Sequence, residues 1–263
     1  METAVRVVMV TGGTGVIGGA IARRIAALPG AEVVLACRDA EKAKAAAAAV
    51  IRATGNPRVR AELVDVARQA SVRALAARWH GPLHVLVNNA AVTPKRRQET
   101  PEGIELQFAT NVLGYFWMME AFAPILERCA PARIVNVASA WSGDLELTDL
   151  EFSRRPYNNG TAYRQSKQAD RMLTASFAER LAPLGISVNA CHPAEVGSPL
   201  SRNLGFALTD SPDEGADTPV WLATSPEAAG VTGTYFERRR ETRCRFAADR
   251  AAVAALHDAC RRY

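Results

Sequence analysis

The chain has 263 residues, of which 48% are hydrophobic and 22% charged, an ordinary composition for a globular protein with a buried core. No apolar run reaches the roughly 20 residues that a membrane-spanning helix needs, so we expect no integral membrane segment. The net charge of +5 at pH 7 suits a polyanionic ligand such as a dinucleotide without requiring nucleic acid.

The N-terminus and the cysteines give no sign of export. Met1-Glu2-Thr3 leads straight into an apolar run, with neither a basic region nor a cleavage site, so we expect a cytoplasmic protein. The five cysteines are odd in number and form no CxxC pair, which indicates buried thiols and no metal site. The basic cluster Arg238-Arg239-Arg240 with Arg243 and Arg245 indicates a solvated strand end; the alternative is a nucleic-acid or anionic-lipid surface.

Apolar runs rich in β-branched residues alternate with longer helical patterns along the chain. The runs predict strands at Val5–Val10, Glu32–Cys37, Arg58–Val64, Leu83–Val87, Arg133–Val137, Ile186–Ala190 and Thr232–Phe236. The helical patterns lie at Val16–Leu28, Ala40–Ala53, Arg68–Trp79, Pro101–Arg128, Thr161–Leu181, Thr218–Thr224 and Phe246–Arg262. This alternation, without a linker, predicts an α/β domain whose doubly wound parallel sheet of about seven strands is flanked by helices.

Two irregular segments interrupt the alternation, at residues 142–160 and 193–217. The second contains three prolines and three glycines among scattered apolar side chains. Long irregular segments beside strand ends commonly build binding sites, so we expect residues 193–217 to form a substrate-binding lid.

A glycine-rich loop, Thr11-Gly12-Gly13-Thr14-Gly15-Val16-Ile17-Gly18, lies between the first predicted strand and the first helix. Glycines at this place allow a tight turn and let backbone N–H groups approach a pyrophosphate at the helix N-terminus. The loop therefore predicts dinucleotide binding, and the alternative is a plain glycine turn.

The end of the second strand indicates which dinucleotide. Arg38 is the first residue past the strand and Lys42 follows one turn later, which favours the 2′-phosphate of NADP(H) over NAD(H). Asp39 points the other way, because a carboxylate at this place binds a free 2′-hydroxyl.

Tyr163 and Lys167 lie four residues apart in the longest helical pattern, so they share a helix face. An isolated tyrosine has a pKa near 10, and a nearby ammonium lowers that pKa by stabilising the phenolate. The pair therefore predicts acid/base chemistry.

Ser139 follows the fifth strand, at the sheet edge where open α/β folds bind ligands, and a hydroxyl there can hold a substrate carbonyl against the tyrosine. Asn111 is a polar residue inside an apolar helical segment, which indicates a function or a capped kink.

With these motifs in place, the sequence resembles the short-chain dehydrogenase/reductase superfamily over almost its whole length, and most closely the retinol dehydrogenase-like branch. The superfamily resemblance rests on Thr11–Gly18, Asp65, Asn88–Ala91, Asn111, Ser139, Tyr163-Arg-Gln-Ser-Lys167 and His192-Pro193. The branch resemblance rests on Leu35–Asp39, Glu105–Phe108, Tyr157–Gly160, Thr218-Pro219 and Gly230–Phe236. It implies a single-domain Rossmann fold over residues 1–263 and an NADP(H)-dependent oxidoreductase that interconverts a carbonyl and an alcohol.

The resemblance also implies roles for individual residues. Tyr163 would exchange the proton with the substrate oxygen, Lys167 would lower its pKa and bind the nicotinamide ribose, Ser139 would orient the carbonyl, and Asn111 would position a water. Cofactor contacts would come from Gly12, Thr14, Gly15, Val16, Ile17, Gly18, Arg38, Lys42, Asp65, Val66, Asn88, Ala90, Tyr163, Lys167, Pro193, Val196 and Ser198. For the substrate we expect an apolar pocket, with contacts from Trp141, Tyr157, Glu195, Leu200, Leu204 and Phe206.

Several positions depart from the family pattern. Val16 stands where short members usually carry glycine, Ala194 replaces a glycine after Pro193, and Ala91 ends the Asn-Asn-Ala motif. Because a residue with a Cβ adopts φ > 0 only at a cost, Val16 bears on loop shape and cofactor affinity. The glycine spacing also admits an epimerase or dehydratase that retains its cofactor, and a non-catalytic NADP-binding sensor or scaffold is the third reading. The expected partner is a small carbonyl or alcohol, not nucleic acid, and a homodimer or homotetramer is compatible with such a domain.

Overall fold

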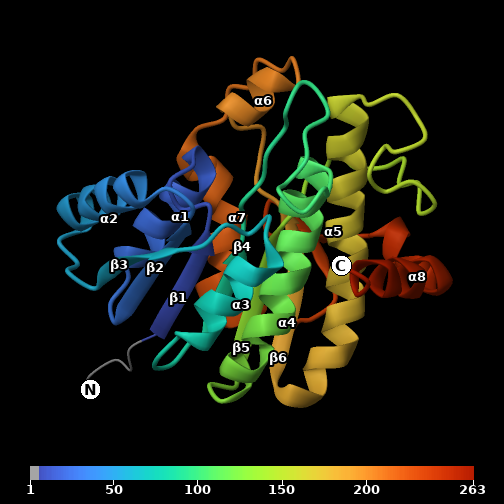
Figure 1. Ribbon diagram of the computed structural model, residues 1–263. Helices are drawn as coiled ribbons and strands as arrows, with labels where there is room; N and C mark the ends of the chain where they lie inside the picture. Colours follow the sequence, from blue (N-terminus) through green and yellow to red (C-terminus); the bar gives the residue numbers. More distant parts are fainter. Residues whose placement is uncertain (1–5) are drawn as a thin grey trace.

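A twisted sheet with helices on both faces forms the protein, as the computed structural model shows for residues 6–263 (Figure 1). The strands lie side by side in the order β3-β2-β1-β4-β5-β6-β7-β8, and only the β7–β8 pair is antiparallel. Their bounds are β1 Arg6–Thr11, β2 Ala31–Cys37, β3 Val59–Leu63, β4 Val85–Asn88, β5 Ala132–Val137, β6 Ile186–His192, β7 Tyr235–Glu237 and β8 Arg240–Thr242. The predictions made for Met1-Glu2-Thr3 and for Val5 lie outside the described residues.

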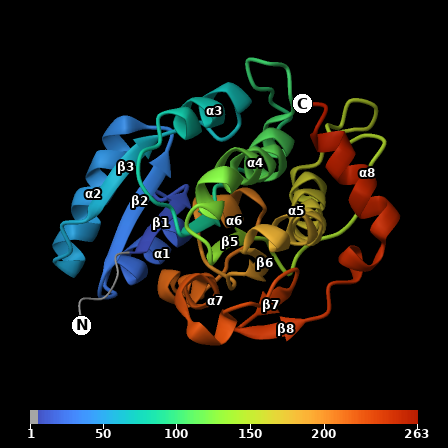
Figure 2. The ribbon, with the colours of Figure 1, turned by 90° about the horizontal axis from the view of Figure 1, so that it is seen from below.

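Helices cover the two faces in separate layers (Figure 2). The first layer is α1 Val16–Ala26, α2 Ala40–Thr54 and α7 Pro212–Thr224; the second is α3 Gln69–Ala77, α4 Gly114–Glu127 and α5 Asn159–Leu181. A short π-helix, Phe108–Leu113, precedes α4, and α6 Pro199–Asn203 lies above the sheet edge. The last helix, α8 Arg250–Cys260, packs against α5, and short 3₁₀ turns occur at Ala182–Leu184, Pro226–Ala228 and Arg245–Ala248. None of the helices within residues 6–263 has the length and apolarity to cross a membrane.

The central strands are apolar throughout because both of their faces are covered. Met9 and Val34 face one hydrophobic core, beneath α3, α4 and α5. Val10 and Leu35, their neighbours along the same strands, face the second core, beneath α1, α2 and α7. A strand buried on both sides has no polar face, which explains the continuous apolar runs from which the sheet was predicted.

The predicted α/β fold is confirmed, with an eighth strand that the sequence pattern did not indicate. Arg238 and Arg239 take left-handed backbone angles, φ 49° and 61°, and turn the chain back from β7 into β8. Arg239 then pairs with Asp217 of α7 at the protein surface, so one member of the basic cluster has an acidic partner. The other departure is at Pro101–Glu105, predicted as helix: Gly103 has φ +83° and the Glu105 carboxylate accepts hydrogen bonds from the N–H groups of Gln107 and Phe108, so the helix begins only at Leu106.

The docking of α8 on α5 includes a buried hydrogen bond. Ser176 Oγ lies 3.0 Å from His257 Nδ1, and the imidazole packs against the rings of Phe116 and Phe177. Burial lowers the pKa of His257 from 6.5 to about 4, with a further contribution from the nearby Arg180. The imidazole is therefore neutral in the folded protein at neutral pH.

We expect His257→Phe to make the thermal stability of the protein less sensitive to acid. Between pH 6.5 and about 4, His257 is protonated in the unfolded chain but stays neutral in the folded protein. The wild type therefore loses stability as the pH falls through this window. Thermal unfolding across that range should show a smaller decrease in Tm for the variant. An equal decrease would contradict a neutral, buried His257.

Candidate active site

The glycine loop builds the first part of the site at the carboxyl end of β1. Gly12 takes a left-handed φ of 67°, and a Cβ on Gly18 would collide with the Gly12 carbonyl and the Asn89 amide, so both positions need glycine. Gly15 is the N-cap of α1, and neither a side-chain cap nor an acidic residue occupies the first turn of that helix. Val16 is the first helical residue and avoids positive φ, so its Cβ fits the loop without strain.

Thr11 and Asn89 tie this loop to the end of β4. The Thr11 hydroxyl accepts hydrogen bonds from the N–H groups of Asn89 at 2.9 Å and Ala90 at 3.1 Å. The Asn89 side-chain amide donates back to the Thr11 carbonyl at 2.9 Å. The turns that follow two neighbouring strands are thereby held together, and they form the floor of a cavity.

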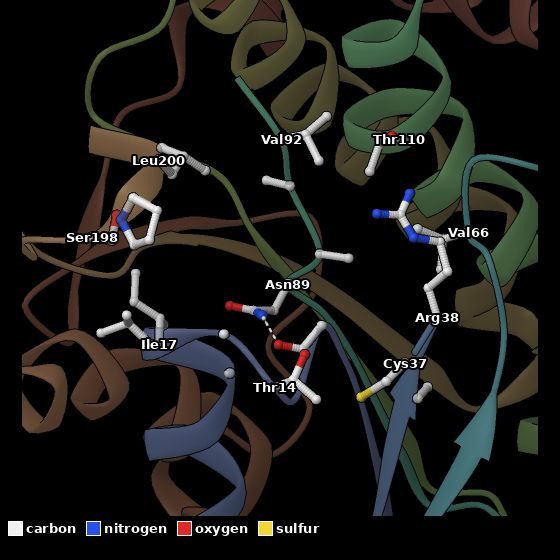
Figure 3. A pocket seen from close by; sticks show the side chains of 18 of the residues that line it. Thr14, Ile17, Cys37, Arg38, Val66, Asn89, Val92, Thr110, Ser198 and Leu200 are labelled. Atoms are coloured by element: carbon white, nitrogen blue, oxygen red, sulfur yellow. Dashed lines mark hydrogen bonds between the residues drawn. The ribbon is translucent and has the colours of Figure 1, made fainter. Parts of the chain in front are cut away.

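That cavity has a volume of about 350 Å³ and runs along the carboxyl edge of the sheet (Figure 3). Eleven of the predicted cofactor residues line it: Gly12, Thr14, Gly15, Val16, Ile17, Gly18, Arg38, Asp65, Val66, Ala90 and Ser198. Other lining residues were not predicted from the sequence, among them Cys37, Asn89, Val92 and Thr110. Thr110 is buried and belongs to the π-helix. The spacing of apolar residues along the sequence does not reveal a π-helix, so the contact of Thr110 with the cavity could not be predicted.

At the end of the cavity next to β2, Arg38 lines the wall, whereas Asp39 and Lys42 do not. Arg38 extends along the wall towards Val66 and Thr110 (Figure 3). Asp39 is the N-cap of α2: its carboxylate accepts a hydrogen bond from the Lys42 N–H at 3.0 Å and lies 3.6 Å from Lys42 Nζ. Those contacts lower the pKa of Asp39, the backbone hydrogen bond most of all. Lys42 itself is exposed and does not line the cavity.

A second cavity of about 110 Å³ adjoins the first and is lined by three of the four predicted catalytic residues. The two share Ile17, Asn89, Ala91, Ser198 and Leu200 as walls. Ser139, Tyr163 and Lys167 line the inner side, and Pro193, Glu195 and Val196 come from the segment after β6. Leu200, Leu204 and Phe206 close the cavity from α6 and the turn after it, within the predicted lid.

Tyr163, Ser139 and Lys167 form one interacting group. Burial raises the pKa of Tyr163, whereas the Lys167 charge and a hydrogen bond with Ser139 lower it. Ser139 Oγ accepts a hydrogen bond from the Trp141 N–H at 3.1 Å, so its own hydroxyl proton is left to donate. Lys167 is 2% exposed and donates to the Val137 carbonyl at 2.9 Å and to the Asp170 carboxylate at 2.8 Å.

The segment that carries Ser139 is braced from two sides. The Ala140 N–H donates to His192 Nδ1 at 3.2 Å. The buried Arg171 guanidinium donates to the Ser139 carbonyl and stacks on the Tyr235 ring, 3.5 Å from its centroid. These contacts fix the loop after β5 against β6 and β7, so the Ser139 hydroxyl has a defined place at the cavity wall.

Besides Lys42, three predicted residues lie outside both cavities. Asn88 is fully buried and donates to Asn136 at 2.9 Å. Asn111 binds both backbone groups of Val92, accepting from its N–H at 2.8 Å and donating to its carbonyl at 3.1 Å, so its side chain anchors the segment after β4. The Tyr157 hydroxyl bonds to Gln107 and to the Pro94 carbonyl, away from the predicted substrate contact.

Ala194 has an unusual backbone conformation beside the second cavity, with a φ of 138°. This region is sparsely populated by residues with a Cβ and costs them about 1–3 kcal/mol. The departure from the glycine pattern at this position is therefore a source of strain in the segment after β6.

We expect Ala194→Gly to raise the free energy of unfolding by about 1 kcal/mol, because relief of the strain exceeds the entropic cost of glycine. Chemical denaturation measures the change. Ala229→Gly is the matched control, because Ala229 is exposed with a φ of −67° and gains nothing from glycine. Equal destabilisation of both variants would refute the strain at Ala194.

Comparison with known proteins places this geometry in a family. Residues 6–207 match the short chain dehydrogenase family. A probable oxidoreductase of Streptomyces antibioticus is 38% identical over 264 residues, covering 92% of this chain and 88% of the relative. Retinol dehydrogenase 13 of Mus musculus is 35% identical over 256 residues, covering 90% of this chain and 76% of the relative.

Solved structures with a similar fold lead to the same family as the relatives found by sequence. An uncharacterised protein of Mycobacterium paratuberculosis has a TM-score of 0.81 at 29% identity, over 99% of this chain and 95% of its own. Pseudomonas aeruginosa RhlG in complex with NADP has a TM-score of 0.70 at 26% identity, covering 90% and 96%. A 3-ketoacyl-(acyl-carrier-protein) reductase of Brucella melitensis in complex with NADH has a TM-score of 0.69 at 26%, covering 89% and 97%. The chain therefore belongs to the short-chain dehydrogenase/reductase family, and it is an oxidoreductase of alcohols and carbonyls that uses a nicotinamide dinucleotide.

Proposed function

We propose that the protein transfers a hydride between NADP(H) and a small lipophilic substrate, interconverting a carbonyl and an alcohol with Tyr163 as the acid/base. One observation carries the proposal. Ser139, Tyr163 and Lys167 line a cavity that shares five wall residues with the cavity of the glycine loop. A dinucleotide in the larger cavity would thus have its reactive end beside the catalytic hydroxyls.

The residues of the larger cavity suit a dinucleotide. The uncapped N-terminus of α1, with no acid in its first turn, offers backbone N–H groups and a positive dipole end to a pyrophosphate. Gly12 and Gly18 keep the loop close enough for the backbone to approach the ligand. When bound, the cofactor supplies or accepts the hydride.

The protein's own residues supply proton transfer and orientation. In the reducing direction the Tyr163 hydroxyl donates its proton to the carbonyl oxygen of the substrate, and the Ser139 hydroxyl donates a hydrogen bond to the same oxygen. In the oxidising direction Tyr163 takes the proton back. Lys167 has three N–H donors, two of which Val137 and Asp170 engage, so one remains for the cavity.

Arg38 supports the preference for NADP(H). Asp39 is occupied as the cap of α2, so it does not present its carboxylate to a ribose in the cavity. Arg38 lines the wall at the same place, and no ion pair to Arg38 occurs within residues 6–263. Guanidinium groups bind phosphates through paired hydrogen bonds, which fits a 2′-phosphate.

The lipophilic substrate class is supported by the walls of the smaller cavity. Trp141 lies against Tyr163, with ring centroids 5.8 Å apart, and meets Phe206 of the lid edge-on at 4.8 Å. Leu200 and Leu204 add aliphatic surface, and Glu195 is an exposed carboxylate at the rim. Apolar walls around a few polar groups favour an uncharged carbonyl compound with a hydrophobic body.

Tyr163→Phe should lower turnover at least about a hundredfold while NADPH binding stays close to wild type, because only the transferred proton is removed. Activity against a panel of ketones and aldehydes, with a fluorescence titration of NADPH, measures both. Tyr263→Phe is the control, since it removes a tyrosine hydroxyl that bonds to Glu151 outside both cavities. Unchanged turnover in Tyr163→Phe would refute the assigned role.

Arg38→Asp should weaken NADPH binding about ten- to a hundredfold, the value of one to two charge-assisted hydrogen bonds, and leave NADH binding equal or tighter. Titration of each cofactor gives the ratio. Arg52→Asp makes the same charge change in the last turn of α2, away from the cavity, and should leave the ratio unchanged. An unaltered ratio in Arg38→Asp would contradict the assignment of the 2′-phosphate to Arg38.

A further inference from the structure

The catalytic lysine has a carboxylate partner that the proposed function does not use. Asp170 lies one turn after Lys167 on α5, and its Oδ2 atom is 2.8 Å from Lys167 Nζ. The exposed fractions of the two side chains are 0% and 2%, so water does not screen the pair. The other carboxylate oxygen, Oδ1, has no hydrogen-bond partner within residues 6–263.

The groups around this pair come from several elements. From α4, Tyr115 places its ring 5.0 Å from Lys167 Nζ and donates its hydroxyl to the Val137 carbonyl, the same oxygen that accepts from Lys167. The titratable and charged groups that face the pair or Tyr163 are Tyr115 of α4, Cys191 of β6, Cys260 of α8 and Glu195 of the segment after β6. Burial raises the pKa values of the tyrosine and of both cysteines, so these three are neutral at neutral pH.

Asp170 is therefore the buried negative charge at the lysine. Burial raises its pKa to about 6, although the Lys167 ammonium pulls the other way, so the carboxyl is ionised at neutral pH. Burial alone would lower the pKa of Lys167, but Asp170 raises it above its ordinary value. The two charges thus stabilise each other in the core, and the Val137 carbonyl gives the ammonium a second partner that does not depend on Asp170.

We propose that Asp170 is a positioning residue, which fixes the Lys167 ammonium at the cavity wall and offsets its positive charge beside Tyr163. With Val137 and Asp170 as acceptors, two N–H groups of Lys167 point into the protein and the third is directed to the ligand side. Tyr163 thus faces a nearly neutral ion pair in place of a lone ammonium. The proposal rests on the proposed function only in treating Tyr163 as the proton donor.

The charge balance has a consequence for Tyr163. A lone buried ammonium at Lys167 would strongly favour the phenolate form of Tyr163, whereas the Asp170 carboxylate disfavours that form. Both effects act on the pKa of Tyr163, which Lys167 lowers and Asp170 and Glu195 raise. Removal of the Asp170 charge should therefore release the Tyr163 proton at lower pH.

Asp170→Asn tests this with an isosteric change that keeps one acceptor for Lys167. We expect the tyrosinate titration of Tyr163 to move to lower pH by about one pH unit or more. The titration is followed by ultraviolet absorbance of the intact protein, with Tyr163→Phe in the same background as the blank. If Asp170→Asn does not accumulate as folded protein, Asp170→Ser, which leaves room for a water, replaces it.

Two controls separate a charge effect from loss of packing. Thr174→Val removes neighbouring buried hydrogen bonds, to the Asp170 carbonyl and to Asn136, without changing a charge. Asp217→Asn removes a carboxylate that pairs with Arg24 and Arg239, outside both cavities. Neither should move the Tyr163 titration. A purely structural Asp170 would give the Asp170→Asn protein lower stability and an unmoved titration, and that result overturns the proposal.

The titration requires neither a substrate nor a bound cofactor, so its outcome is independent of whether a turnover assay succeeds. Where a carbonyl substrate is found, the pH limb of oxidation should move to lower pH in Asp170→Asn by the same amount as the absorbance titration. A moved titration with no turnover in any protein would leave Asp170 as the lysine's positioning residue and refute the proposed function instead.

Discussion

The hydrogen bonds between Thr11 and Asn89 hold together the two turns on which the whole site depends. Parallel strands bring their carboxyl ends to one edge, but the turns that follow them are free to diverge unless something joins them. Here a single hydroxyl accepts from the N–H groups of Asn89 and Ala90, and the Asn89 amide returns the contact. The position of the glycine loop, the floor of the larger cavity and the wall that it shares with the smaller cavity all follow from this junction.

The proposed acid/base chemistry depends on a second constraint, the burial of charge on α5. In its proposed role Lys167 acts on Tyr163 through its positive charge, yet the helix places that charge where water does not reach. The Val137 carbonyl and the Asp170 carboxylate make that burial tolerable. One turn along, Arg171 holds the Ser139 segment, so consecutive residues of α5 support the lysine and the serine separately.

The sheet and the proximity of Tyr163 and Lys167 could be predicted from the sequence because both depend on local rules. Apolar runs identify strands buried on two faces, and a four-residue spacing places Tyr163 and Lys167 on one helix face. Features that depend on distant partners were not predictable. Thr110 lines the cavity because of a π-helix, whereas Asn111 and Tyr157 bond to backbone groups of the segment after β4. The 193–217 segment, expected to be irregular, contains α6 and the first turns of α7, whose starts are set by the capping boxes at Ser198 and Ser211.

Trp141 lies between the proposed proton donor and the segment predicted to form a lid. Its indole contacts both the ring of Tyr163 and the ring of Phe206. A change in the charge of the phenol or a displacement of Phe206 would alter the surroundings of the same indole. Trp141 is therefore a natural fluorophore placed next to the proposed proton donor.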